Sequence, residues 1–346
     1  MKLKEQRFDY TLLLTVSALI MIGGVMVYSS SSALAAGSDK FATHAHFLQR
    51  QVVWVVVAYA MMFFVAGVNL DRYRRFIVPA LLASLGLLIL VMFTPTVRDT
   101  HRWISLYFFK LQPSELFKYT LIFYLAHSLS QKGRTLEDPR VYLWPYGTIL
   151  GLGAVLIVAE PDLGSALVLV GAIIVMLFLA GARANHLAIA IGGSAFAVSL
   201  LVFVLGYKRS RVDSYIASLS DPMSAAYQVK QSILSLASGG WQGVGLGNGI
   251  FKQFFLPEPH TDFILASIGE ELGFIGLVIV VGLLFSIVWR GIRIAAAQED
   301  RFRYLLAVGM TGCLAVNMTL NISVVLGLIP TTGVTLPFLS YGGSSL

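Results

Sequence analysis

Long apolar runs separated by short polar segments recur along the whole chain. Nine of them approach the roughly 20 residues that a helix needs to cross a bilayer, and they predict spans near 10–28, 50–68, 76–93, 114–130, 143–159, 163–181, 186–206, 264–289 and 302–328. A tenth is expected to begin near Pro337 and to be incomplete at Leu346. The pattern predicts an all-α polytopic membrane protein with ten transmembrane helices, forming a single domain over 1–346.

Composition agrees with a membrane setting. Hydrophobic residues make up 57% of the chain and charged residues only 12%, against about 25% charged residues in soluble domains. The single Cys313 lies inside an apolar run, so the chain has no disulfide framework. These features exclude an ordinary soluble protein of two domains.

The distribution of charge predicts an orientation. With a cytoplasmic amino terminus, the inner segments carry 14 basic and seven acidic residues, and the rest of the chain carries 11 of each. The entire net charge of +7 then lies on the cytoplasmic side, as the positive-inside rule requires. The basic segments therefore report topology and indicate no nucleic-acid partner.

The segment 207–265 between the seventh and eighth helices is too long for a simple connection and is expected outside the cytoplasm. Its cations at 208–211 oppose the orientation rule, so we expect them to meet an anion such as a lipid phosphate or a pyrophosphate. Apolar residues at helical spacing over 226–236 predict an amphipathic helix suited to the membrane surface, ending at Gly239. The glycines of 243–249 indicate turns, since no strand precedes them as a nucleotide loop requires.

Asp262 stands at the mouth of the apolar eighth helix. A carboxylate beside lipid costs a few kcal/mol or more unless it faces a polar cavity or a partner. Two interpretations remain: an ion pair that locks two helices together, or a general base where membrane meets water. Glu270 is expected to share the helix face of Asp262, and Glu271 to point elsewhere toward another partner.

Two further charged clusters lie near predicted helix starts. Glu115 and Lys118 are three residues apart, which suits either a salt bridge or a polar cavity around the lysine. Asp162 follows Glu160 and Pro161, where it either caps the sixth helix or serves function. Metal-hydrolase and serine-hydrolase motifs are missing from the sequence. Inverting glycosyl transfer needs a base for an acceptor hydroxyl and cations for a departing phosphate, and residues of both kinds are present.

Five motifs in order resemble the SEDS family of FtsW, RodA and SpoVE proteins, and the resemblance covers residues 10 to 346. They are Gln112-Pro113-Ser114-Glu115-Leu116-Phe117-Lys118, Glu160-Pro161-Asp162-Leu163-Gly164, Pro257-Glu258-Pro259-His260-Thr261-Asp262-Phe263, Gly269-Glu270-Glu271-Leu272-Gly273 and Thr335-Leu336-Pro337-Phe338-Leu339-Ser340-Tyr341-Gly342-Gly343-Ser344-Ser345. The Gly245–Asn248 segment and the Thr-Leu-Pro form of the last motif favour the division-type branch. Some division-type proteins have a lysine where this chain has Thr332, so a cationic role there is not carried over.

The resemblance implies a peptidoglycan glycosyltransferase of the bacterial inner membrane, active on its outer face. It would polymerise lipid II into β-1,4-linked glycan and release undecaprenyl pyrophosphate. Asp262 matches the essential aspartate of the family, the base for the acceptor 4-hydroxyl. The other candidate residues, for pyrophosphate or for substrate more generally, are Arg102, Lys118, Arg209, Arg211, Glu115, His260 and Glu270.

The implied partners are lipid II, the undecaprenyl-pyrophosphate-linked glycan, a single-pass class B penicillin-binding protein that acts as transpeptidase, and other membrane proteins of the divisome or elongasome. The sequence identifies no cofactor and leaves a divalent cation, Mg²⁺ or Mn²⁺, open. A lipid II flippase is the alternative function, although the polar residues gather on the outer half of the predicted spans. A structural scaffold would leave Asp262 unexplained.

Overall fold

The computed structural model describes residues 8–36, 46–94, 102–105, 110–132, 139–221, 224–253, 255–343 and 345–346. Its helices are α1 Tyr10–Ala36, α2 His46–Ala66, α3 Leu70–Tyr73, α4 Ile77–Val91, α5 Pro113–Gln131, α6 Pro139–Ala159, α7 Leu163–Leu179, α8 Ala184–Ser199, α9 Arg209–Ser220, α10 Tyr227–Gly239, α11 Ile264–Ala296 and α12 Arg301–Val325. A 3₁₀ turn, Arg74–Phe76, precedes α4, and a π-helical turn, Leu200–Val204, extends α8. Strands β1 Ile104–Ser105 and β2 Lys110–Leu111 form an antiparallel pair.

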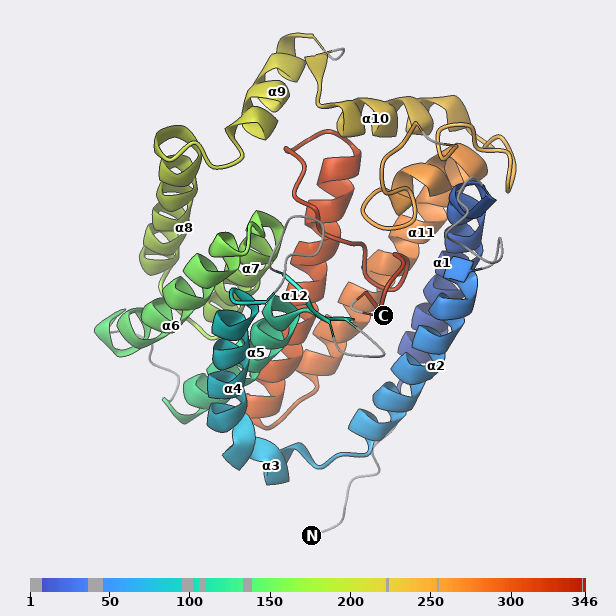
Figure 1. The fold of residues 1–346 in the computed structure, drawn as a ribbon. Helices are drawn as coiled ribbons and strands as arrows, with labels where there is room; N and C mark the ends of the chain where they lie inside the picture. The colour runs from blue at the N-terminus through green and yellow to red at the C-terminus, as the bar shows by residue number, and fades with distance from the viewer. Residues whose placement is uncertain are drawn as a thin grey trace. The chain divides into compact units, whose positions relative to one another are not determined.

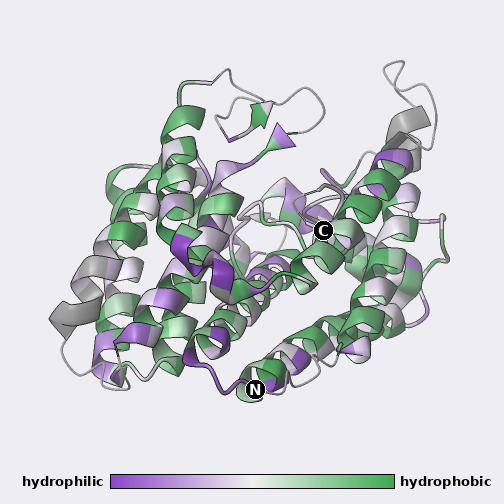
Figure 2. Cartoon of the chain, turned by 90° about the horizontal axis from the view of Figure 1, so that it is seen from below, coloured by the Kyte–Doolittle hydropathy of each residue, from purple (hydrophilic) through white to green (hydrophobic). Residues whose placement is uncertain are grey.

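Each of the nine apolar runs up to residue 328 forms a helix, as predicted (Figure 1). Among the described residues, six helices are long and apolar enough to cross a membrane, and Tyr146–Ala159 and Leu163–Leu179 are shorter apolar helices. Figure 2 shows hydrophobic residues along most of the helices. The chain is therefore an all-helical protein of the multi-pass membrane type.

The chain divides into two compact units. The first comprises Met1–Met62, Gln228–Arg290 and Thr335–Leu346, and the second comprises Phe63–Tyr227 and Gly291–Val334. Asp262, His260 and Glu270 belong to the first unit, whereas the candidate cations belong to the second.

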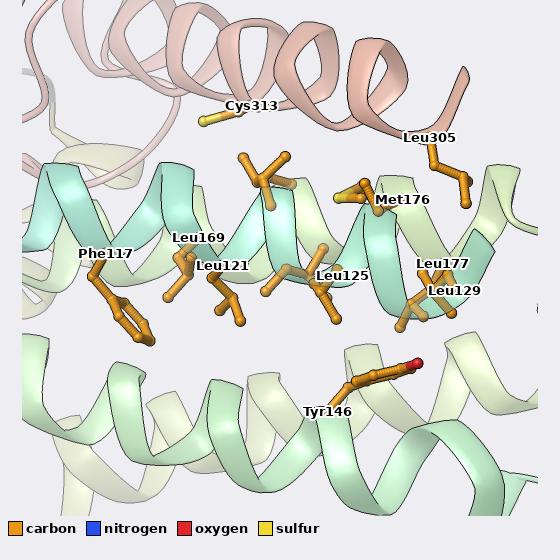
Figure 3. Packing of buried hydrophobic residues seen from close by; sticks show 14 of the residues in the cluster. Phe117, Leu121, Leu125, Leu129, Tyr146, Leu169, Met176, Leu177, Leu305 and Cys313 are labelled. Carbon is orange, nitrogen blue, oxygen red and sulfur yellow. The ribbon is translucent and has the colours of Figure 1, made fainter. Parts of the chain in front are cut away.

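The core of the second unit lies around α5. Phe117, Leu121, Leu125 and Leu129 follow one another along this helix and are fully or almost fully buried. Figure 3 shows them with Tyr146 of α6, Leu169 and Met176 of α7, and Leu305 and Cys313 of α12. Helix α12 packs against α7 and α5, and α4 packs against α5. This apolar packing fixes the start of α5, where Glu115 and Lys118 lie.

In the first unit, α10 packs against the start of α11 through small residues. Val229, Ser232, Ser235 and Gly239 form its buried face, and the Ser235 hydroxyl lies 3.2 Å from the Ala266 carbonyl oxygen. A Cβ on Gly239 would overlap the carbonyl oxygen of Gly269, so only glycine allows this approach. The predicted helix and its end at Gly239 are confirmed, and its apolar residue Ile233 stays exposed.

The expected tenth helix is not formed in the described residues that follow Pro337. The backbone N–H of Ser340 donates to the Leu336 carbonyl at 3.0 Å, and that of Phe338 donates to the Ser345 carbonyl at 2.8 Å. Phe338 and Gly342 both have positive φ, of 67° and 128°. These dihedrals interrupt helical geometry, so the segment forms a compact turn.

Candidate active site

Asp262 lies in the turn directly before α11 and is partly exposed. Glu258, with φ of 51°, closes this turn because its carbonyl accepts hydrogen bonds from the N–H groups of Thr261 at 3.2 Å and Phe263 at 3.4 Å. Phe263 and the following residues are buried. The carboxylate is therefore held at the amino-terminal end of an apolar helix, where the helix dipole favours negative charge.

His260 is a packed aromatic residue. Its ring lies 5.0 Å from the Phe47 ring and 5.6 Å from the Tyr341 ring, and these two rings are 5.3 Å apart. Its Nε2 is 4.0 Å from a carboxylate oxygen of Glu258. A role for His260 in substrate binding stays a prediction.

Glu270 holds the glycine-rich loop that precedes the Asp262 turn. Its Oε1 accepts hydrogen bonds from the N–H of Ile250 and of Phe251, the latter at 3.0 Å, and its Oε2 accepts from the Ser235 hydroxyl at 3.2 Å. The expected shared face with Asp262 is wrong, because it assumed one helix and Asp262 precedes α11. Binding of substrate by Glu270 stays a prediction.

Glu271 has a different set of partners, as expected. Its carboxylate accepts from the Ser29 hydroxyl at 2.7 and 2.8 Å and from the N–H of Gly247 at 2.9 Å, and it pairs with Lys252. Lys252 is 2% exposed and Glu271 is 1% exposed. The turns predicted for the glycine loop are confirmed, and its backbone N–H groups bind carboxylates of the protein itself.

A second polar cluster surrounds the connection between α6 and α7. The Nε of Arg102 donates to the Glu160 carbonyl at 3.0 Å, and Arg102 and Lys208 both donate to the Pro161 carbonyl. Asp162 caps α7 by accepting from the N–H of Ser165 at 3.1 Å. The capping interpretation of Asp162 is thereby confirmed.

Glu160 is a buried carboxyl group in this cluster. It is 0% exposed, and neither carboxyl oxygen has a hydrogen-bond partner among the described residues. Burial and, after it, the charge of Asp162 raise the pKa of Glu160 to about 8, against the opposing effect of Arg102. The group therefore holds its proton near neutral pH.

Arg102, Lys208 and Arg211 form a group of cations, which we call the cation cluster. Burial, and after it the charges of Arg211 and Arg102, lowers the pKa of Lys208 to about 8. Arg211 also donates to the Thr331 carbonyl at 2.9 Å. The three cations repel one another, and a bound anion would relieve this repulsion.

The two remaining cationic candidates, Lys118 and Arg209, each lie beside a carboxylate of their own helix. Lys118 is 2% exposed and pairs with Glu115 at 2.8 Å within α5, so the salt-bridge interpretation holds for this pair. Arg209 is largely exposed and lies 3.5 Å from Asp213. Sequence reasoning missed Lys252 as a partner of Glu271 and left Lys208 out of the candidates. A lysine directly after two apolar residues, as in Ile250-Phe251-Lys252, was the available signal.

Known proteins match this chain over its length. The family described as cell cycle protein, which covers FtsW, RodA and SpoVE, matches residues 10–346. The chain belongs to the FtsW/RodA/SpoVE family. It is 41% identical over 345 residues to the probable peptidoglycan glycosyltransferase FtsW of Trichlorobacter lovleyi, covering 98% of this chain and 89% of the relative. It is 39% identical to the stage V sporulation protein E of Bacillus subtilis, covering 100% of this chain and 95% of the relative.

Two solved structures of family members share the fold. One, described as "Structural coordination of polymerization and crosslinking by a peptidoglycan synthase complex", has a TM-score of 0.80 at 28% identity and covers 99% of this chain and 94% of its own. The rod shape determining protein RodA of Thermus thermophilus has a TM-score of 0.72 at 27% identity, covering 99% and 93%. The resemblance inferred from the five motifs is confirmed.

Proposed function

We propose that this chain is a peptidoglycan glycosyltransferase that polymerises lipid II at the outer face of the bacterial inner membrane. Relatives named as peptidoglycan glycosyltransferases, about 40% identical over nearly the whole chain, support the activity. Asp262 is the observation that assigns this activity to a site, because it is a partly exposed carboxylate held in a hydrogen-bonded turn before an apolar helix.

In the proposed reaction Asp262 accepts the proton of the acceptor sugar's 4-hydroxyl. The oxygen then bonds to the anomeric carbon of the lipid-linked donor as the bond from that carbon to the pyrophosphate oxygen breaks, with inversion. The electron pair leaves with undecaprenyl pyrophosphate, whose charge the cation cluster would stabilise. The depressed pKa of Lys208 supports this role, since an anion would restore the charged form. Lys118 and Arg209 stay candidates for the same anion, as do Glu115, His260 and Glu270 for substrate.

The proposal includes the topology. A cytoplasmic amino terminus and an outer segment 207–265 would place Asp262 and the cation cluster on the external side. The partner would be a class B penicillin-binding protein, as the similarity to a chain of a peptidoglycan synthase complex supports. A requirement for Mg²⁺ or Mn²⁺ is left open.

Purified chain with its transpeptidase partner and labelled lipid II tests the function. Wild-type protein is expected to yield glycan polymer, and Asp262→Ala to yield none while keeping its thermal midpoint. Polymerisation by both proteins alike would remove the assigned base. Transbilayer movement of labelled lipid without polymer from either protein would instead establish the flippase alternative.

A further inference from the structure

The segment Leu336–Ser345, which we call the C-terminal clamp, has no part in the proposed chemistry. Leu336 and Leu339 are fully buried, and Ser340 is 0% exposed. The Ser345 hydroxyl closes the turn, because it lies 2.6 Å from the Ser340 carbonyl oxygen and 2.7 Å from the Gly342 carbonyl oxygen and shares its single proton between them. Each buried polar group of this turn must find a hydrogen-bond partner, so the partners show what the clamp holds in place.

The clamp contacts the two residues directly before Asp262. The Ser340 hydroxyl lies 2.7 Å from the Thr261 carbonyl oxygen, and the Tyr341 N–H donates to the His260 carbonyl at 2.8 Å. The same hydroxyl accepts from the N–H of Leu336 at 2.8 Å. A serine hydroxyl has one proton, so that proton goes to the Thr261 carbonyl.

Other elements of the same unit anchor the clamp. Gln51 of α2 accepts from the Gly342 N–H at 3.2 Å, and Gln51 is itself buried. On α1, a Cβ placed on Gly23 would lie 2.8 Å from the Leu339 carbonyl oxygen, so the two backbones touch. The Tyr341 ring packs with Phe47. The clamp therefore has a fixed position from which it can hold the aspartate turn.

The opposite side of the turn is also fixed. The Ser267 hydroxyl donates to the Pro259 carbonyl at 3.3 Å, and the Glu258 carbonyl accepts the N–H groups of Thr261 and Phe263. Without the clamp, the carbonyls of His260 and Thr261 would lose the hydrogen bonds that set the peptide planes leading to Asp262.

We propose that Ser340 is a positioning residue for Asp262, with the C-terminal clamp fixing the backbone that aims the proposed base. The inference rests on the proposed function. A general base must approach within about 2.6–3.2 Å of the group it deprotonates, and a misplacement of about 1 Å can cost 10²-fold in rate. Ser340→Ala is therefore expected to lower kcat about 10- to 100-fold while KM changes less than about threefold.

Ser31→Ala is the matched control, because Ser31 is as fully buried as Ser340 and its hydroxyl donates to the Val27 carbonyl of its own helix at 2.6 Å. It is expected to keep kcat within about threefold of wild type, since removing a neutral hydrogen bond costs about 1 kcal/mol in stability. Ser340→Cys keeps the shape of the side chain with a weaker donor, and its kcat should fall between those of wild type and Ser340→Ala. Thermal midpoints in detergent check that each protein is folded.

The result that overturns the clamp is a wild-type kcat for Ser340→Ala, an equal loss in Ser31→Ala, or a loss confined to KM. If Ser340→Ala does not fold, the kcat of Ser340→Cys decides, and a wild-type value rejects the inference. The double variant Asp262→Ala/Ser340→Ala should be no worse than Asp262→Ala, because a positioning residue acts only through the base. An active Asp262→Ala rejects the proposed function itself, and the clamp inference with it, whereas an inactive Asp262→Ala with an unaffected Ser340→Ala rejects only the clamp.

Discussion

The buried pair of Lys252 and Glu271 predicts a large and strongly coupled loss of stability. Lys252→Met removes the cation and leaves a carboxylate that is 1% exposed and that, among the described residues, keeps Ser29 and Gly247 as its hydrogen-bond donors. Breaking a buried ion pair by removing one partner costs about 3–5 kcal/mol. In the double variant Lys252→Met/Glu271→Gln no buried charge remains, and the amide can still accept from Gly247 and donate to Ser29. We expect it to be more stable than Lys252→Met by about 2–3 kcal/mol.

The five tryptophans allow unfolding by SDS in mixed micelles to be followed by fluorescence. A matched cycle on Arg209 and Asp213, an exposed pair 3.5 Å apart, serves as the control and should show coupling below about 1 kcal/mol. A cost below about 1 kcal/mol for Lys252→Met, or additive effects in the Lys252–Glu271 cycle, would refute the reasoning that this pair is desolvated and interdependent.

Three further predictions concern other parts of the chain. Gly239→Ala should destabilise the protein by about 1–3 kcal/mol or more, because its Cβ would overlap the Gly269 carbonyl. Gly151→Ala, in open space on α6, should be neutral or stabilising in the same unfolding assay, and equal effects of the two variants would contradict the close approach of α10 to α11. The pKa of Glu160 is raised from 4.5 to about 8, so the contribution of this group to stability is fully present below about pH 4.5 and is lost as pH rises through about 8. Between pH 5.5 and 8.5 the thermal midpoint should therefore fall less in Glu160→Gln than in wild type, and parallel curves for the two proteins would contradict the shifted pKa. Arg211→Ala should raise the KM for lipid II about tenfold or more, which is the effect of losing one charge-assisted hydrogen bond, and Arg209→Ala should raise it less than about threefold. Initial polymerisation rates measure both KM values, and the reverse order would exclude the cation cluster as the pyrophosphate site.

The helices were readable from sequence because apolar runs near membrane length leave few alternatives. The start of α10 and its end at Gly239 followed from periodicity and a glycine stop, and the cap at Asp162 followed from its place before an apolar run. Helix α9 within the segment 207–265 was not predicted, since Arg209–Ser220 has no buried residue to impose a pattern.

Pairings between distant residues could not be read from the chain. Lys252 and Ser29 meet Glu271 only because α1, the glycine loop and α11 come together, and sequence spacing carries no such information. The start of α11 at Ile264 agrees with the predicted span, but the expected shared face extended helical rotation back to Asp262, which lies before the helix. The tenth helix failed because Phe338 and Gly342 adopt positive φ and the Ser340 hydroxyl accepts the Leu336 N–H, and the apolar pattern shows neither feature.

The most direct test of the proposed base is the single-turnover rate of glycan bond formation by Asp262→Asn with its partner present. Asparagine keeps the size and much of the hydrogen bonding of the side chain but cannot accept the proton. The account predicts a fall of at least about 10²-fold with an unchanged thermal midpoint. A rate within about threefold of wild type in a folded protein, far short of the contribution of a general base, would contradict it.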